Sequence, residues 1–283
     1  MDNRTLIDAW SLKNELGNKD LVILDCRSQL LDPEAGEKLY REGHIPGAIH
    51  ADMEKDLSSP ITDDSGRHPL PDPFDFAVQL RQWGIDDGTQ VVVYDDMNGA
   101  MAVRAWFLLR WLGHERVAVL DGGLPAWQAV SGELSDNEAQ TTPVKGGPVV
   151  LHNDWLVDTA KVQANLDNPS FTLIDARAAE RFAGEQEPID PVAGHVPGAL
   201  NRPLTDNLNA EGRFKTAKQL KDEWQQLLGE VEAEDTVMMC GSGVTACHHL
   251  LALEIAGLKG ARLYPGSWSE WIRDPARPVA TGS

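Results

Sequence analysis

The sequence predicts an α/β protein of two homologous domains, each a mainly parallel β-sheet with helices on both faces. Short apolar runs with the length of buried strands occur at 22–24, 91–94 and 117–120. Segments with helical spacing of apolar residues, 74–83 and 102–112, lie between them. Strands that alternate with helices form parallel sheets covered on both faces, because each helix carries the chain back to the same edge of the sheet.

Three blocks of sequence recur in the same order in the two halves of the chain, which indicates two copies of one domain. The recurring blocks are 21–27 with 171–177, 43–48 with 194–199, and the region from 91 to 127 with that from 236 to 271. Between the copies lies a stretch of Gly, Ser, Pro and acidic residues without periodicity, which is typical of a linker. We therefore expect domains at 1–135 and 151–283 and a linker at 136–150.

Composition excludes several classes of protein. The 25 basic and 44 acidic residues give a net charge of −19, which disfavours nucleic acids and anionic membrane surfaces as partners. No apolar run has the length of a membrane span, and the N-terminus has no signal-peptide pattern, so we expect a cytoplasmic protein. Three cysteines are too few for a disulfide framework, and Cys240 and Cys247 with His248 and His249 fit no zinc spacing. We expect free thiols and neither a metal nor a cofactor.

The two copies differ in chemistry at one position of the third block. A constant offset of 144 residues pairs Gly99 with Gly243 and Asp96 with Cys240. A carboxylate in the first half therefore stands opposite a thiol in the second, directly after a buried strand and before a helix. We expect a working site in the second domain and a non-catalytic first domain, in which Asp96 replaces the cysteine.

The segment Cys-Gly-Ser-Gly-Val-Thr-Ala at 240–246 has the composition of an anion-binding loop. Its two glycines permit positive φ, so several backbone N–H groups can point inward, and the helix that we expect to begin near Thr245 adds its partial positive end. Such donors favour a thiolate and would stabilise a persulfide anion. The alternative is a structural cysteine at a strand end. The expected site residues are the nucleophile Cys240 with Gly241, Ser242, Gly243, Val244 and Thr245.

These features resemble the tandem-domain rhodaneses, over approximately residues 5–271. The resemblance is carried by the paired Asp-x-Arg strands, the paired Gly-His-Ile/Val-Pro-Gly-Ala segments and the cysteine loop, which is similar to that of 3-mercaptopyruvate sulfurtransferases. It implies two rhodanese-like domains and a sulfurtransferase. In this family the cysteine, here Cys240, takes sulfur from 3-mercaptopyruvate and releases pyruvate. The outer sulfur of the persulfide then passes to a thiol acceptor, such as thioredoxin, or to cyanide.

The resemblance also implies roles for residues outside the loop. An arginine at the position of Arg181 binds the substrate carboxylate in this family. A second arginine usually follows nine residues later, but Asp190 stands there, so the second guanidinium is missing or comes from elsewhere. The family further places His44 near the loop, where it would pair with Ser242 in proton transfer. The alternative is a histidine that holds a turn. We interpret Arg177 as part of a strand-end ion pair and as a second candidate for substrate binding.

Three other functions compete with transfer from mercaptopyruvate. Thiosulfate is an alternative donor, although residues 241–246 contain no Lys or Arg and so suit a monoanion better than a dianion. A cysteine phosphatase or arsenate reductase would need an arginine where Ala246 stands. A scaffold with a vestigial site is the third alternative, and the intact loop argues against it.

Overall fold

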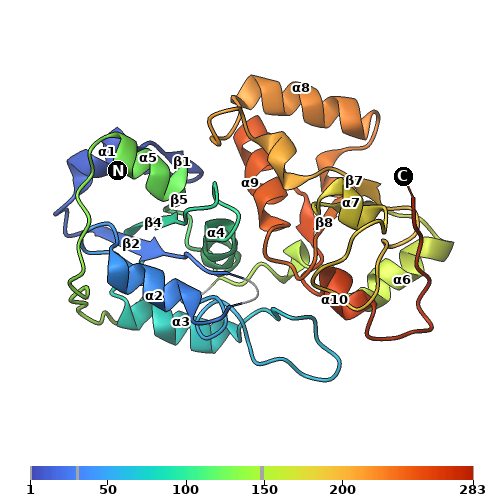
Figure 1. The fold of residues 1–283 in the computed structure, drawn as a ribbon, viewed down its shortest axis with the longest axis horizontal. Coiled ribbons are helices and arrows are strands. Elements are labelled where there is room, and N and C mark those ends of the chain that lie inside the picture. The colour runs from blue at the N-terminus through green and yellow to red at the C-terminus, as the bar shows by residue number, and fades with distance from the viewer. Residues whose placement is uncertain (1, 30–31, 147–149, 283) are drawn as a thin grey trace. The chain divides into compact units, whose positions relative to one another are not determined.

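The computed structural model describes residues 2–29, 32–146 and 150–282, which form two compact units (Figure 1). The first unit is Met1–Ser59, Leu70–His152 and Glu211–Arg213, and the second is Pro60–Pro69, Asn153–Ala210 and Phe214–Ser283. The division is therefore not a single cut in the sequence, because a ten-residue segment of the first half belongs to the second unit. Of the expected linker, 136–146 contains no helix or strand, and 147–149 lies outside the described residues.

The first unit is built on a five-stranded parallel sheet with the order β1-β5-β4-β2-β3. The predicted strands at 22–24, 91–94 and 117–120 and the predicted helices at 74–83 and 102–112 are found close to these positions. The strands are β1 (Leu6–Ile7), β2 (Leu21–Asp25), β3 (Ile49–His50), β4 (Gln90–Tyr94) and β5 (Val117–Leu120). The helices are α1 (Ala9–Glu15), α2 (Ala35–Glu42), α3 (Pro73–Gln82), α4 (Ala102–Trp111) and α5 (Gly123–Ala129).

The second unit repeats this plan with a four-stranded parallel sheet in the order β7-β6-β8-β9. The strands are β6 (Thr172–Asp175), β7 (Leu200–Asn201), β8 (Thr236–Met239) and β9 (Arg262–Leu263). The α-helices are α6 (Thr159–Asp167), α7 (Ala179–Phe182), α8 (Ala217–Leu228), α9 (Cys247–Ala256) and α10 (Ser267–Trp271). Three short 3₁₀ helices are η1 (Asn153–Trp155), η2 (Leu204–Asn207) and η3 (Ala233–Asp235).

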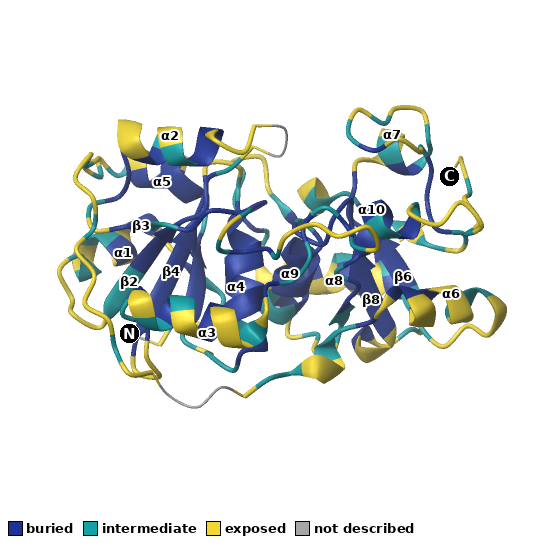
Figure 2. Ribbon diagram, turned by 90° about the horizontal axis from the view of Figure 1, so that it is seen from below, coloured by how far each residue is buried: buried dark blue, intermediate teal, exposed yellow. Residues whose placement is uncertain are grey.

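Both sheets are buried on their two faces, as parallel sheets require. Alternate side chains of the strands in the first unit pack with α1 and α5, including Val92 with Trp127, and α4 packs against β4 and β5. In the second unit, Met239 packs with Trp271 of α10 in the same way, while α9 contacts β8. Figure 2 shows the buried residues gathered in the strands and in α4 and α9. The predicted fold class, two repeated α/β domains, is confirmed.

Helices α1 and α6 show how the repeat extends to local structure. The side chain of Asp8 accepts the N–H of Ser11 at the start of α1, and that of Asp158 accepts the N–H of Lys161 at the start of α6. An acidic N-cap satisfies one of the free N–H groups of the first turn and complements the helix dipole. Within the described residues, no helix combines the length and apolar character needed to cross a membrane.

Candidate functional site

Cys240 directly follows the last residue of β8, and its side chain is almost completely buried. Its Sγ accepts the backbone N–H of Gly243 at 3.2 Å. This turn requires a glycine for two reasons: its φ is +78°, and a Cβ at this position would collide with the carbonyl oxygen of Pro265. The glycine of the loop therefore places a backbone donor on the sulfur.

Other N–H groups of the loop remain available for an anion. Those of Gly241, Ser242, Val244 and Thr245 donate to no acceptor in the part of the chain that the structure describes. Helix α9 starts at Cys247, two residues later than expected, and its first turn contributes further partial positive charge. The loop thus combines one N–H group already on the sulfur with several unused donors beside it.

The beginning of α10 holds the loop in place. The N–H of Cys240 donates to Oγ of Ser267 at 3.1 Å. In return, Trp268 and Ser269 donate their N–H groups to the carbonyl oxygens of Cys240 and Gly241, at 3.0 and 2.8 Å. Both the N–H group and the carbonyl oxygens at the start of the loop are therefore hydrogen-bonded to α10. The loop is held in this conformation without a substrate.

Ser242 contacts a histidine that the sequence analysis missed. Its Oγ lies 2.7 Å from Nδ1 of His68, and both side chains are buried. His68 belongs to the segment Pro60–Pro69, which folds with the second unit. This segment has no helix or strand and no counterpart among the recurring blocks, so no pattern in the sequence connects it with the cysteine loop.

The structure corrects the expectation for His44. Its Nδ1 lies 2.8 Å from the carbonyl oxygen of Tyr40, and its Nε2 lies 3.0 Å from that of Asn137. Its ring also stacks on Tyr40, just as His195 in the second domain stacks on Phe182. Both ring nitrogens are engaged by backbone oxygens of its own unit, so the pairing of His44 with the loop serine was wrong. Both histidines hold turns.

Arg177 is also held by its own domain. Its Nη2 lies 2.7 Å from Oδ2 of Asp175 and 2.8 Å from the carbonyl oxygen of Gly194, and its side chain is only 1% exposed. Arg27 makes the same ion pair with Asp25 in the first domain. Because this arrangement occurs in both domains, including the one whose loop has no cysteine, it is part of the scaffold. The ion pair agrees with the first interpretation of Arg177, and its role in substrate binding stays a prediction.

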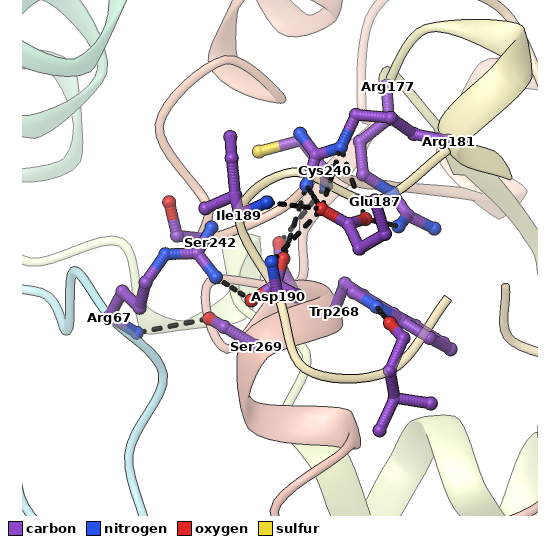
Figure 3. A network of polar contacts seen from close by, with 12 residues as sticks. Arg67, Arg177, Arg181, Glu187, Ile189, Asp190, Cys240, Ser242, Trp268 and Ser269 are labelled. Carbon is purple, nitrogen blue, oxygen red and sulfur yellow. Dashed lines mark hydrogen bonds and ion pairs between the residues drawn. The ribbon is translucent and has the colours of Figure 1, made fainter. Parts of the chain in front are cut away.

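Arg181 lies beside the cysteine loop within a network of ion pairs (Figure 3). Its Nη2 contacts Oε1 of Glu187 at 2.8 Å and Oδ2 of Asp190 at 3.2 Å. Arg67, which the sequence analysis did not identify, pairs with Asp190 from the other side. Burial lowers the pKa of the Arg67 guanidinium, while the negative charge of Cys240 opposes this effect. The role of Arg181 in substrate binding stays a prediction.

The counterpart of Cys240 in the first domain is Asp95, not Asp96. In the first sheet Asp25 is paired with Tyr94, and in the second the equivalent aspartate is paired with Met239. The next residues, Asp95 and Cys240, therefore occupy the same place. The expected assignment of Asp96 was wrong because the first loop contains one more residue before its glycine than the second, so the offset of 144 does not hold at this point.

Asp95 fills the loop of the first domain as the sulfur does in the second. Its buried carboxylate accepts four backbone N–H groups at 2.7–2.8 Å, those of Met97, Gly99, Met101 and Ala102. Gly99 is the counterpart of Gly243, which donates to Sγ of the cysteine. Burial raises the pKa of the Asp95 carboxyl, and the four donors act in the opposite direction. The same loop architecture thus holds an anionic group in the first domain.

The remaining cysteines have no such surroundings. Cys26 and Cys247 are buried and form no disulfide, and burial raises the pKa of Cys26 well above its usual range. Cys247 Sγ lies 3.5 Å from the carbonyl oxygen of Gly243, an acceptor that does not favour a thiolate. No cluster of three or more His, Cys, Asp or Glu side chains in the described residues is arranged to hold a metal ion.

Comparisons with known proteins show what the chain and its fold are similar to. The model of the rhodanese-like domain matches residues 8–130 and 158–274. A Pseudomonas aeruginosa protein named a probable 3-mercaptopyruvate sulfurtransferase is 50% identical over the whole of both chains. A Mycobacterium tuberculosis protein provisionally named thiosulfate sulfurtransferase SseB is 41% identical, over 99% of this chain and 98% of the other. The crystal structure of SseA from Escherichia coli, described as a 3-mercaptopyruvate sulfotransferase, superposes with a TM-score of 0.78 at 33% identity, covering 94% of this chain and all of that one.

Proposed function

The chain belongs to the rhodanese-like family of sulfurtransferases, and from this premise we propose that it transfers sulfur from 3-mercaptopyruvate through a persulfide on Cys240. The observation that carries the proposal is the buried Sγ that accepts the Gly243 N–H in a loop with further unused donors. The names of similar proteins support the choice of donor.

In the first half-reaction, the Cys240 thiolate attacks the sulfur of 3-mercaptopyruvate. A sulfur–sulfur bond forms, and the carbon–sulfur bond breaks with its electron pair remaining on carbon, as the enolate of pyruvate. The proton of the donor thiol moves to this carbon, so pyruvate leaves and the enzyme keeps a persulfide anion. The free N–H groups of the loop would stabilise the negative charge on the outer sulfur.

In the second half-reaction, an acceptor thiolate attacks the outer sulfur of the persulfide. The bond between the two sulfurs breaks, Cys240 returns to the thiolate, and the acceptor leaves as a persulfide. Cyanide would leave as thiocyanate. A small protein thiol such as thioredoxin is the acceptor we propose, in the cytoplasm. The three cysteines without disulfides support a reducing compartment.

Ser242 and His68 are the groups that we propose hold the proton between its removal from the donor thiol and its delivery to carbon. The serine Oγ and histidine Nδ1 lie 2.7 Å apart, which is the distance of a strong hydrogen bond. A histidine can take up and release a proton at neutral pH, and the serine hydroxyl can relay it. Ser242 lies only two residues after Cys240 in the chain, so the pair is close to the proposed nucleophile.

The charges around the loop favour a monoanionic donor. Each arginine in this network is matched by one carboxylate, so the site has no excess of positive charge for a dianion such as thiosulfate. The paired groups are Arg67, Arg177 and Arg181 with Asp190, Asp175 and Glu187. The name of the M. tuberculosis relative keeps thiosulfate as the second candidate donor.

Mass spectrometry of the intact protein tests the proposal. Treatment with 3-mercaptopyruvate is expected to add one sulfur atom and to release one pyruvate per chain. The addition should disappear in Cys240→Ser and persist in the matched control Cys247→Ser. Sulfur uptake that survives Cys240→Ser would contradict the proposed nucleophile, and faster loading from thiosulfate than from mercaptopyruvate would contradict the proposed donor.

A further inference from the structure

Arg67 is held in place on both sides. Its backbone N–H donates to Oγ of Ser269 in α10 at 3.0 Å. Gly66 before it packs so closely that a Cβ there would lie 2.7 Å from the carbonyl oxygen of Gly266. His68 after it contacts the serine of the cysteine loop. The position of this arginine is therefore set by its neighbours, although the segment has no regular secondary structure.

The guanidinium groups of Arg67 and Arg181 converge on Gly241, the residue after the nucleophile. A Cβ built on Gly241 would lie 3.0 Å from Nη2 of Arg67 and 3.6 Å from Nη2 of Arg181. Asp190 connects the two cations, with Oδ1 on Arg67 and Oδ2 on Arg181 (Figure 3). Its side chain is only 3% exposed, so this bridge is shielded from solvent.

Both guanidinium groups keep N–H donors that no described residue uses. Among the described residues, Nε and Nη2 of Arg67 and Nη1 of Arg181 have no hydrogen-bond acceptor. The side chains are 25% and 17% exposed, so a small molecule can reach them. A planar cation with free N–H groups beside a reactive sulfur is suited to an anionic oxygen group of the substrate, and two such cations are suited to a carboxylate.

We propose that Arg67 supplies a second guanidinium for the carboxylate of the sulfur donor, together with Arg181, and that Asp190 is the residue that positions the two. This inference rests on the proposed function, because it assumes a donor with a carboxylate. Asp190 stands where the resemblance leads one to expect an arginine. It forms an ion pair with Arg67, which belongs to the segment Pro60–Pro69.

The test is the kinetics of pyruvate release in full-length Arg67→Ala. Loss of a charge-assisted contact with the carboxylate should raise KM for 3-mercaptopyruvate by about 10- to 100-fold, with a smaller change in kcat. The inhibition constant of pyruvate, which carries the same carboxylate, should rise in parallel. Arg67→Lys should recover only part of the affinity, because an ammonium lacks the planar pair of donors.

Two controls separate substrate binding from a structural effect. Arg273→Ala removes an equal charge from a residue that holds the same segment, through the carbonyl oxygen of Ser65 at 3.0 Å, and should leave KM unchanged. Loading Cys240 with inorganic polysulfide, which has no carboxylate, should proceed in Arg67→Ala as in wild type. An unchanged KM in Arg67→Ala, or an equal loss with polysulfide, would overturn the role of Arg67.

The contribution of Asp190 is tested by a double-mutant cycle. Asp190→Asn should raise KM more than it lowers kcat, because it frees both guanidinium groups. Its effect should not add to that of Arg67→Ala, since both changes disrupt the same arrangement. Full additivity would contradict the positioning role. Wild-type protein that releases no pyruvate from mercaptopyruvate would contradict the proposed function itself, which is a different outcome from normal release with unaffected variants.

Discussion

The histidine that contacts Ser242 comes from an irregular segment, whereas the histidines of the two recurring Gly-His-x-Pro-Gly-Ala segments hold turns. His44 and His195 each place Nδ1 2.8 Å from a backbone carbonyl oxygen and stack on an aromatic ring. A residue that recurs in both domains performs a task that both domains share. Chemistry that only one domain performs is expected to depend on residues without a counterpart in the other, and His68 is a residue of this kind.

Replacement of His68 should therefore affect the reaction rate, whereas replacement of His44 should affect stability. His68→Gln keeps a hydrogen-bonding side chain but removes the proton carrier, so single-turnover pyruvate release should slow by about 100-fold. His44→Gln should lower the free energy of unfolding and leave the release rate of the folded protein near that of wild type. An equal slowing in both variants, with folded protein verified by circular dichroism, would count against the role of His68.

Asp95 shows that the loop of the first domain is a site for an anion filled by the protein's own side chain. Its carboxylate accepts four backbone N–H groups, and no side chain other than a carboxylate could accept all four with two oxygens at these positions. The first domain is therefore closed to a second substrate at this loop, because its donors are already occupied.

Asp95→Asn should lower the free energy of unfolding by about 3 kcal/mol, since the amide NH₂ would face two N–H groups that have lost their acceptor. The neighbouring Asp96→Asn is the matched control, and because Asp96 is exposed, its effect should stay within about 0.5 kcal/mol. Urea denaturation measures both. A larger effect at Asp96 than at Asp95 would instead support Asp96 as the counterpart of Cys240, which the strand register contradicts.

Among the helices, α9 carries two buried histidines in its first turn. The side-chain amide of Asn207 donates to Nδ1 of His248 and of His249, at 3.1 and 2.8 Å, and Nε2 of His249 donates to the carbonyl oxygen of Arg202 at 2.7 Å. These bonds require a neutral ring in His249. Burial, together with the charge of His248, lowers the pKa of His249 to about 3.

The consequence is a loss of stability in mild acid. An unfolded histidine takes up a proton near pH 6.5, but the folded protein excludes this proton until about pH 3. The free energy of unfolding should therefore be highest above pH 6.5 and fall by up to about 1.4 kcal/mol for each pH unit below it. Urea denaturation at about pH 7, 6 and 5 measures the slope. His249→Gln should flatten it, and an unchanged slope would contradict this assignment.

At the level of elements, the apolar periodicity was sufficient to predict which of these segments form strands and which form helices. The predicted strand 117–120 and helix 102–112 correspond to β5 and α4 within one residue. The start of α9 was expected near Thr245 but lies at Cys247. Helix α10 holds the carbonyl oxygens of Cys240 and Gly241 at the start of the loop. The carbonyl oxygens of residues 244–246 accept N–H groups only three residues later, so these residues form turns and the α-helix begins at Cys247.

The net charge of the whole molecule, −19, acts on substrates before they reach the site. The charges beside the cysteine cancel, so the long-range field around the protein repels an anionic donor. Raising the ionic strength from about 0.01 M to about 0.15 M shortens the range of this repulsion. The kcat/KM for 3-mercaptopyruvate should rise, whereas sulfur transfer from the loaded enzyme to the neutral thiol 2-mercaptoethanol should not change. A fall with mercaptopyruvate would mean that attraction by the arginines dominates.

Local patterns in the chain were enough to identify the repeated domains, their parallel sheets and the loop of Cys240, the proposed nucleophile. Periodicity, glycine spacing and a strand followed by a helix are all written in consecutive residues. Tertiary structure alone selected Arg67 and His68 as neighbours of the cysteine and Asp95 as its counterpart. Arg67 and His68 lie in a segment without periodicity, so its sequence does not show which residues it will contact. Asp95 was missed because one extra residue in the turn that follows it shifts the alignment by one position and leaves the surrounding patterns unchanged.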